Sequence, residues 1–240
     1  NHGNITIKKG FVNNGSSNTC IGGIIGIFDG RISDGTKKHA LQASTNTGDI
    51  TIEEGVVSNF SFYIAGIAGY SIGSNASNLV NNGDVVINGT FNDRFSVAGC
   101  IAYNQTQVKT GTTGLTNNGN ITLTTKTDCN ADAYIGGISS IATEGNPLRY
   151  ATNNGDISVS GEYDFDGRLC IGGVLGWDNI AGTNTLINTG DITINKDFKC
   201  TQGTNVKEIG GCIGMAQSTV SFAYNSGNIT IKEGAQIQNG

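Results

Sequence analysis

The chain has 240 residues, of which 37 are glycine and one is proline, and its formal net charge is −5. An apolar fraction of 37% with so little net charge argues against a disordered chain, and the acidic balance argues against nucleic acid as a partner. No apolar run approaches the roughly 20 residues that a membrane-spanning helix needs, so we expect no membrane insertion in this segment.

The first seven residues, NHGNITI, open a phrase that recurs along the whole chain. Its copies begin at Asn1, Asn46, Asn81, Asn117, Asn153, Asn188 and Asn225. Successive copies start 45, 35, 36, 36, 35 and 37 residues apart. A nearly fixed period in this range is typical of solenoids and other repeat architectures.

Each copy of this phrase predicts a short strand that follows a turn. In the second copy we expect Ile50 and Ile52 to point inward and Asp49 and Thr51 outward, because successive side chains of a strand alternate between its faces. Apart from Leu123, every inward residue of the seven copies is β-branched, which suits a pleated, buried surface. The preceding Asn-x-Gly predicts a corner, and we attribute its glycine to a need for positive φ.

A second phrase lies between successive copies of the first and predicts a second strand. It reads CIGGIIG at Cys20, and its other copies begin at Tyr63, Ser96, Tyr134, Cys170 and Glu208. A column of large side chains follows it: Ile27, Tyr70, Tyr103, Ile141, Trp177 and Met215. The three aromatic residues of this column, Tyr70, Tyr103 and Trp177, could stack on sugars, or they could pack at the end of the strand.

Two phrases in fixed order predict an all-β fold, a parallel β-helix of about six to seven coils with a repeat of about 36 residues. Like strands would then stack about 4.8 Å apart. A β-propeller is the alternative, but it needs about four strands per blade, and we identify two per repeat. We expect residues 1–240 to form a single segment of a longer protein, with other domains or a partner covering the ends.

The phrases IGGIIG and N-x-G-D-I-T-I resemble the GLUG-type repeats of bacterial surface proteins. The resemblance covers essentially the whole chain, and it departs at SVAGCIA from Ser96 and at YIGGISS from Tyr134, which lack the final glycine. It implies an extracellular protein on a bacterial cell surface that acts as an adhesin or structural stalk and is not an enzyme. A host or surface glycan, or a protein, would be its partner.

The loops between the phrases carry the candidate chemistry, because they differ from repeat to repeat. Their charged residues are Asp93, Arg94, Asp128, Asp132, Asp164, Asp166, Arg168, Lys196, Asp197 and Lys199. A polysaccharide lyase or glycoside hydrolase on a β-helix would use such carboxylates and cations, so a carbohydrate-active β-helix is the alternative function. The candidate binding residues are Asp164, Asp166, Arg168 and Trp177.

Two outward columns of the first phrase each have two interpretations. One is Asn4, Asp49, Asp84, Asn120, Asp156, Asp191 and Asn228, whose stacked carboxylates either hold a cation or hydrogen-bond their own turns. The other is largely threonine, which either binds ice or packs across strands. We favour the second interpretation for both columns.

The six cysteines do not suggest a dense disulfide framework. Cys100 and Cys212 replace an apolar residue of the second phrase, so we expect buried thiols there. Cys129, Cys170 and Cys200 fall on successive coils, where one disulfide is conceivable. No zinc or nucleophile motif is present, and we predict no catalytic residue, no metal and no cofactor.

Overall fold

The structure, a computed structural model, describes residues 1–30, 39–73, 75–105, 112–128, 132–143, 147–164, 167–200 and 207–237. Residues 128 and 164 are described by their backbone alone. In this part of the chain every regular element is a strand, and every strand pair is parallel. The predicted parallel β-solenoid is therefore confirmed. We call one repeat of about 36 residues a coil.

Sheet A contains 12 strands in two columns that merge at two long strands. The first column is β1 (Ile5–Ile7), β7 (Ile50–Ile52), β13 (Val85–Ile87), β19 (Ile121–Asp128), β23 (Ile157–Asp164), β27 (Ile192–Ile194) and β32 (Ile229–Ile231). The second column is β2 (Val12–Asn13), β8 (Val57–Ser58), β14 (Thr90–Phe91), the later halves of β19 and β23, β28 (Lys199–Cys200) and β33 (Gln236–Ile237).

Sheets B and C each contain six strands and hold the second phrase. Sheet B is β3 (Thr19–Gly22), β9 (Phe62–Ala65), β15 (Phe95–Ala98), β20 (Ala133–Gly136), β24 (Leu169–Gly172) and β29 (Lys207–Gly210). Sheet C is β4 (Ile25–Asp29), β10 (Ala68–Ile72), β16 (Ile101–Gln105), β21 (Ser139–Thr143), β25 (Leu175–Asp178) and β30 (Ile213–Ala216).

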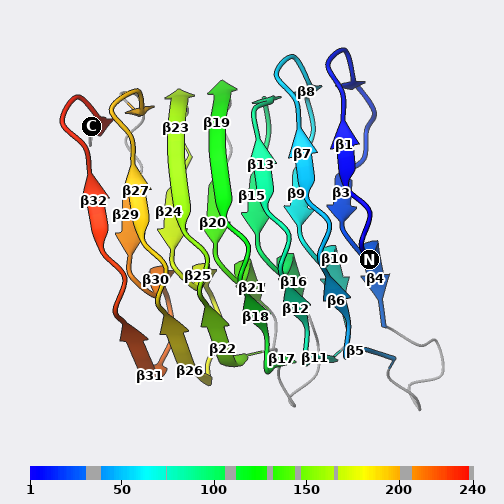
Figure 1. Cartoon of the computed structure of the whole chain (residues 1–240), viewed down its shortest axis with the longest axis vertical. Coiled ribbons are helices and arrows are strands. Elements are labelled where there is room, and N and C mark those ends of the chain that lie inside the picture. The colour runs from blue at the N-terminus through cyan, green and yellow to red at the C-terminus, as the bar shows by residue number, and fades with distance from the viewer. Residues whose placement is uncertain are drawn as a thin grey trace.

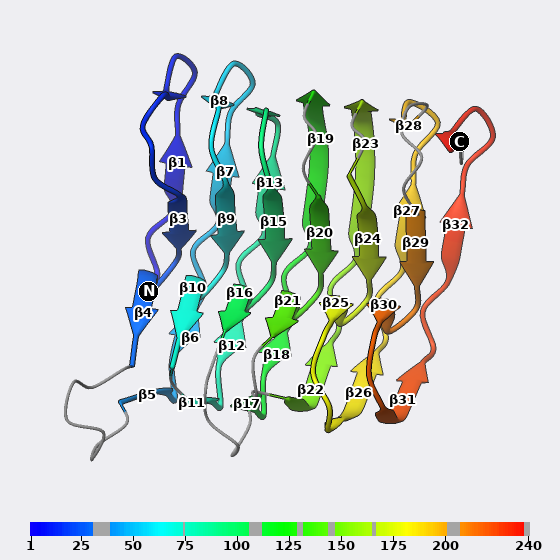
Figure 2. The same cartoon turned by 180° about the vertical axis from the view of Figure 1, so that it is seen from behind.

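Sheet D contains nine strands and closes each coil. Its strands are β5 (Ala40–Gln42), β6 (Thr45–Asn46), β11 (Asn75–Ser77), β12 (Val80–Asn81), β17 (Thr112–Thr113), β18 (Thr116–Asn117), β22 (Leu148–Asn153), β26 (Thr183–Asn188) and β31 (Val220–Asn225). The strands lie side by side along the molecule, and its longest axis follows the strands rather than the direction of stacking (Figures 1 and 2).

The register places like residues of the repeat directly against one another. Ile50 pairs with Ile5 on one side and with Val85 on the other, and Asn81 pairs with Asn46 and Asn117. The predicted inward residues Ile50 and Ile52 are fully buried, and Thr51 between them is partly exposed. The phrase therefore recurs because each coil repeats the same corner and the same inward pair.

The sequence predicts one strand from each phrase, but in the structure each phrase joins two strands. The prediction of two strands per repeat is therefore wrong. The second phrase passes from sheet B to sheet C at a Gly-Gly pair in four copies, as at Gly22 and Gly23, and at an Ala-Gly pair in the two copies with Ala65 and Ala98. A Cβ atom on Gly22 would lie 2.1 Å from the Ile25 carbonyl oxygen, so the bend is too tight for a side chain in this coil, although alanine occupies the paired position 65. The first phrase likewise ends a sheet D strand at its asparagine and begins a sheet A strand at its isoleucine.

Two separate apolar cores fill the coil. One lies between sheets A and B and contains Ile121, Leu123 and Ile135, and the other lies between sheets C and D and contains Ile101 and Leu186. The repeated asparagines pack between the cores against the second glycine of each pair. A Cβ atom on Gly137 would lie 2.3 Å from Cγ of Asn153, which explains why this waist accepts only glycine.

The glycine of Asn-x-Gly does not adopt a positive φ, so that predicted reason is wrong. A Cβ atom on Gly83 would lie 2.1 Å from the carbonyl oxygen of Gly48, one coil earlier. Glycine is needed there because the backbones of successive coils approach closely at the corner. Positive φ occurs elsewhere, as at Gly55 (84°) in a sheet A turn.

Candidate functional site

Arg168 and Trp177, two of the four predicted binding residues, lie on one outer surface of the coil. We call this surface the B–C angle, because it lies where sheets B and C meet at the glycine bend. Arg168 directly precedes β24, and Trp177 belongs to β25. The Arg168 guanidinium donates to Sδ of Met215 at 3.8 Å, and Met215 pairs with Trp177 across the strands.

The other two predicted binding residues are not brought to the B–C angle by anything the structure describes. Asp164 is the last residue of β23 and pairs with Asp128 through the backbone. Asp166 lies outside the described residues. The predicted quartet is thus represented by Arg168 and Trp177 alone.

The aromatic rings of the B–C angle stack on one another. Tyr70 and Tyr103 are parallel, with ring centroids 4.7 Å apart and planes 4° apart, and Tyr63 meets both edge to face. Tyr134 and Trp177 stack with centroids 5.4 Å apart. Because these contacts occupy ring faces that a sugar would use, the geometry favours packing over sugar stacking for this column.

The polar atoms of the B–C angle are also largely enclosed. In the described part of the chain, Arg94 Nε and Trp177 Nε1 are buried without a hydrogen-bond partner. The Tyr134 hydroxyl donates to Oδ2 of Asp132 at 2.6 Å. Burial is the main cause of the raised pKa of Tyr134, and the contact with Asp132 raises it further. Burial likewise raises the pKa of Tyr63, and the neighbouring Arg94 offsets part of that effect. A ligand would have to separate the rings to reach these atoms.

The candidate carboxylates beside the arginines are already used by the fold. Asp132 Oδ1 accepts from the backbone N–H of Arg168 at 2.8 Å, in addition to the tyrosine contact on its other oxygen. Asp93 accepts from the backbone N–H of Arg94 at 2.7 Å and from Ser61 at 3.3 Å. Neither carboxylate faces a base or a nucleophile through these contacts.

The outward Asx column forms a ladder between coils. The backbone N–H of Asp84 donates to Oδ1 of Asp49 at 2.9 Å, and that of Asn120 donates to Oδ1 of Asp84 at 2.7 Å. The same contact recurs at Asp156, Asp191 and Asn228. These side chains therefore bond the next coil rather than their own turn, and the backbone N–H donors stabilise the stacked carboxylates.

The cysteines behave mainly as buried thiols. Cys100 is fully buried and Cys212 is 8% exposed, as predicted, and burial raises the pKa of the Cys100 thiol to about 12. Cys170 and Cys200 form no disulfide with each other, and Cys129 lies outside the described residues. Cys170 donates to Oε2 of Glu208 at 3.0 Å.

A pocket that the sequence did not predict lies at the outer edge of sheet A. Its volume is about 500 Å³. It is lined by Glu54, Gly55, Asn88, Gly89, Thr90, Thr124, Thr125, Lys126, Gly161 and Glu162, and we call it the corner pocket. The sequence does contain the cause of this pocket, because one corner of the repeat changes in length. The change could be linked to a pocket only once the stacking of the coils was known.

No family model, curated protein or solved structure matches this chain. The resemblance to GLUG-type repeats therefore stays a prediction. Among the described residues, no group of three or more histidine, cysteine, aspartate or glutamate side chains is placed to hold a metal ion. The described part of the chain contains no helix with the length and apolar character required to cross a membrane.

Proposed function

We propose that this chain is a non-enzymatic β-solenoid that serves as an adhesive or structural stalk module on a bacterial cell surface. The observation that supports the proposal most is the use of repeated polar side chains in contacts between coils. The buried amide of Asn117, for example, donates to Asn153 Oδ1 at 2.8 Å and accepts from Asn81 Nδ2 at 2.8 Å. Such residues hold the stack together and are not available for chemistry.

The partners in this proposal are a host or surface glycan or protein on the side of the solenoid and other domains or a partner protein at its ends. The last sheet A strand supports the second part, because the apolar side chains Ile229 and Ile231 are 45% and 54% exposed there. Parallel strand edges with apolar side chains favour further pairing, and solenoids commonly cap them.

Incubation with acidic polysaccharides, with and without calcium, tests the proposal against the carbohydrate-active alternative. We expect retention of the protein on some glycan or cell surfaces and no release of new sugar chain ends. Asp164→Asn and Asp166→Asn serve as matched variants, and both should keep the stability of the parent within about 0.5 kcal/mol, as ordinary surface changes do. Turnover that either variant abolishes would overturn the proposal.

A further inference from the structure

One corner of sheet A differs in length between coils. Four residues, 53–56, separate the paired positions Ile52 and Val57, and the Val56 N–H donates to the Glu53 carbonyl at 3.3 Å. Equivalent turns close at 8–11, 195–198 and 232–235. Only residues 88–89, 124–125 and 160–161 occupy this corner in the three coils between them.

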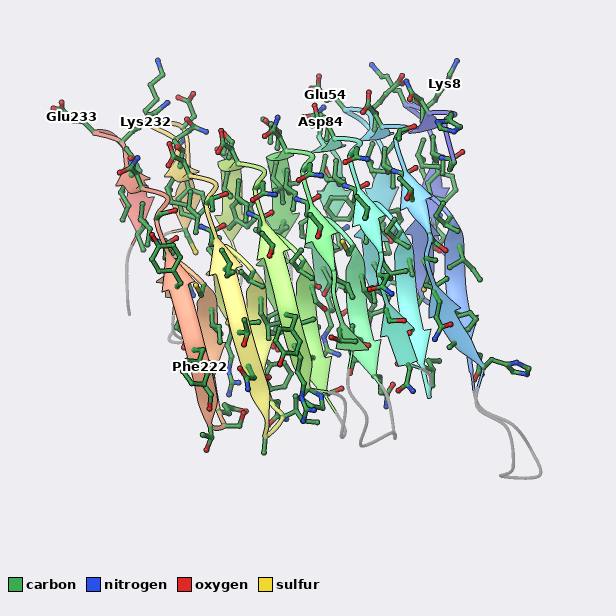
Figure 3. All side chains as sticks on the ribbon, turned by 60° about the horizontal axis from the view of Figure 1, so that its bottom comes forward. Lys8, Glu54, Asp84, Phe222, Lys232 and Glu233 are labelled. Atoms are coloured by element: carbon green, nitrogen blue, oxygen red, sulfur yellow. The ribbon has the colours of Figure 1, made fainter. Side chains whose placement is uncertain are left out.

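The corner pocket is the consequence of this shortening. Asn88, Gly89 and Thr90 form its floor, and the coil that contains them ends below both neighbours in Figure 1. The turn at Glu54 and Gly55 forms one wall, and strands β19 and β23 form the other. Figure 3 shows Glu54 projecting from the same edge as Lys8, Lys232 and Glu233, which lie on the longer turns.

Three polar side chains of the pocket are not used by the stack, whereas Thr125 Oγ1 donates to the hydroxyl of Tyr163, one coil later, at 2.6 Å. Within the described residues, the side chains of Asn88, Thr90 and Thr124 make no hydrogen bond. Asn195, the equivalent of Asn88 in a later coil, instead donates to Ser158 Oγ at 2.8 Å and accepts from Lys232 at 2.9 Å. These amide and hydroxyl groups are partly or fully exposed in one hollow, so they can hydrogen-bond a ligand that both donates and accepts.

The charges of the pocket are nearly balanced. Lys126 Nζ lies 3.9 Å from Oε2 of Glu162, and Lys199 Nζ lies 3.3 Å from Oε1 of the same carboxylate. Glu54 lies on the opposite wall. An anionic ligand would meet two carboxylates, and the lysine beside one of them is already paired. The residues that line the pocket include no large apolar side chain, so an apolar ligand would find little to pack against.

We infer that the corner pocket binds a neutral saccharide unit, with the Asn88 amide and the Thr90 and Thr124 hydroxyls contacting its hydroxyl groups. A volume of about 500 Å³ lies within the usual range for small-ligand sites. The inference rests on the proposed adhesive function and names the ligand class for it. A stalk with this pocket would contact glycans along its side.

Titration of the isotope-labelled chain with cellobiose, lactose and maltose, followed by amide NMR, tests this inference. We expect saturable shifts at Asn88, Gly89 and Thr124 with at least one sugar. Thr124→Trp fills the pocket from an exposed position, and Asn88→Ala removes the amide. Each variant should weaken binding by roughly tenfold or more.

Lys8→Trp is the matched control, because Lys8 is exposed, occupies the same column as Thr124 and lies outside the pocket. It should bind like the parent, and thermal unfolding should show all three variants folded. Three results would overturn the inference: no saturable shift with any neutral disaccharide, saturable shifts only with glucuronate or the dipeptide Gly-Gly, or equal binding by Thr124→Trp and Lys8→Trp. Sugar binding elsewhere would leave the adhesive function standing, whereas polysaccharide turnover would overturn that function alone.

Discussion

In each of the five internal copies of the repeat, one buried asparagine satisfies groups from three successive coils. The Asn117 amide nitrogen donates to the Gly119 carbonyl at 2.7 Å and to Asn153 Oδ1 at 2.8 Å, and its oxygen accepts from Asn81. Asn117 is fully buried. Only a side chain with an acceptor and two donors in this geometry fits, which explains why the residue is asparagine at all seven positions of the repeat.

Asn117→Asp should destabilise the protein strongly. The substitution replaces the NH₂ group with an oxygen that faces the acceptors Gly119 O and Asn153 Oδ1, and it buries a charge among them. We expect a loss of about 3–5 kcal/mol at neutral pH, measured by urea unfolding. The loss should shrink in acid, where the carboxyl group can donate one hydrogen bond.

Asn118→Asp is the control for this prediction, since Asn118 is exposed and bonds the amide of Asn82 in the outer ladder. Its cost should stay below about 1 kcal/mol, as for most surface substitutions. Equal losses at the two positions would show that burial of the ladder does not matter.

Asp178 makes the stability of the protein depend on pH. Its side chain is fully buried at the end of β25, and burial raises its pKa to about 6, although Thr183 and Ser218 hydroxyls donate to it. The pKa of an aspartate in the unfolded chain is about 3.9. Because the folded value is higher, the protonated carboxyl group stabilises the fold below about pH 4, and this contribution is lost as the pH rises through the folded value.

Comparison with Asp178→Asn isolates this contribution. Between pH 4 and pH 7 the free energy of unfolding of the parent should fall by about 3 kcal/mol relative to that of the variant. Urea unfolding of both proteins across this range measures the difference. Parallel pH profiles of the two proteins would contradict the assignment.

At the scale of the elements, sheet D contains a corner that local preference does not explain. The residues Ala43, Asn78, Gly114, Tyr150, Thr185 and Phe222 all have positive φ. They fall in one column, because the strands on either side of them pair in register. Glycine or asparagine would adopt this conformation without strain, whereas a β-branched or aromatic residue pays for it in conformational energy.

Thr185→Asn should therefore stabilise the protein. Thr185 has a φ of 54°, which disfavours its branched Cβ, and asparagine tolerates this region. We expect a gain of about 1 kcal/mol in thermal or urea unfolding. Thr193→Asn, in an extended strand of sheet A, is the control and should be neutral or destabilising. A loss of stability in Thr185→Asn would contradict the strain interpretation.

The sheet A strands could be predicted from the sequence because their signal is local. Ile50 and Ile52 alternate with polar residues, and their β-branched side chains prefer strands. The glycine bend between sheets B and C was missed, because an apolar run such as CIGGIIG gives no alternation at the point where it turns. The strained corner at Thr185 was missed because its residue types argue against it.

The candidate site was less predictable than the fold. Arg168 and Trp177 stay predicted binding residues, and the ring stacking between coils could be recognised only once Tyr134 was placed beside Trp177. The corner pocket could not be predicted, because it forms only where a short corner of one coil stacks against a longer turn of its neighbour. Asn88-Gly89 appears in the sequence as an ordinary turn, and its role emerges from the longer turn at Glu54 one coil earlier.

At the scale of the whole molecule, the solenoid divides its polar residues into two groups. Side chains that recur in every coil, such as the Asn117 and Asp84 columns, bond the next coil and hold the stack together. Where the coil length changes, the described side chains of Asn88, Thr90 and Thr124 make no hydrogen bond and line the corner pocket. Under the proposed function, the ligand binds where the repeat is broken, and the contacts that stabilise the stack lie where the repeat is kept.

The most direct test of this division is the free energy of unfolding of a matched pair, Asn117→Ala and Asn88→Ala, measured in urea beside the parent. Both changes remove an asparagine amide, one from the buried ladder and one from the corner pocket. We predict a loss of about 3 kcal/mol for Asn117→Ala, because three hydrogen-bonding groups lose their partner. Asn88→Ala should stay within about 0.5 kcal/mol of the parent. Similar losses for the two variants would contradict the account.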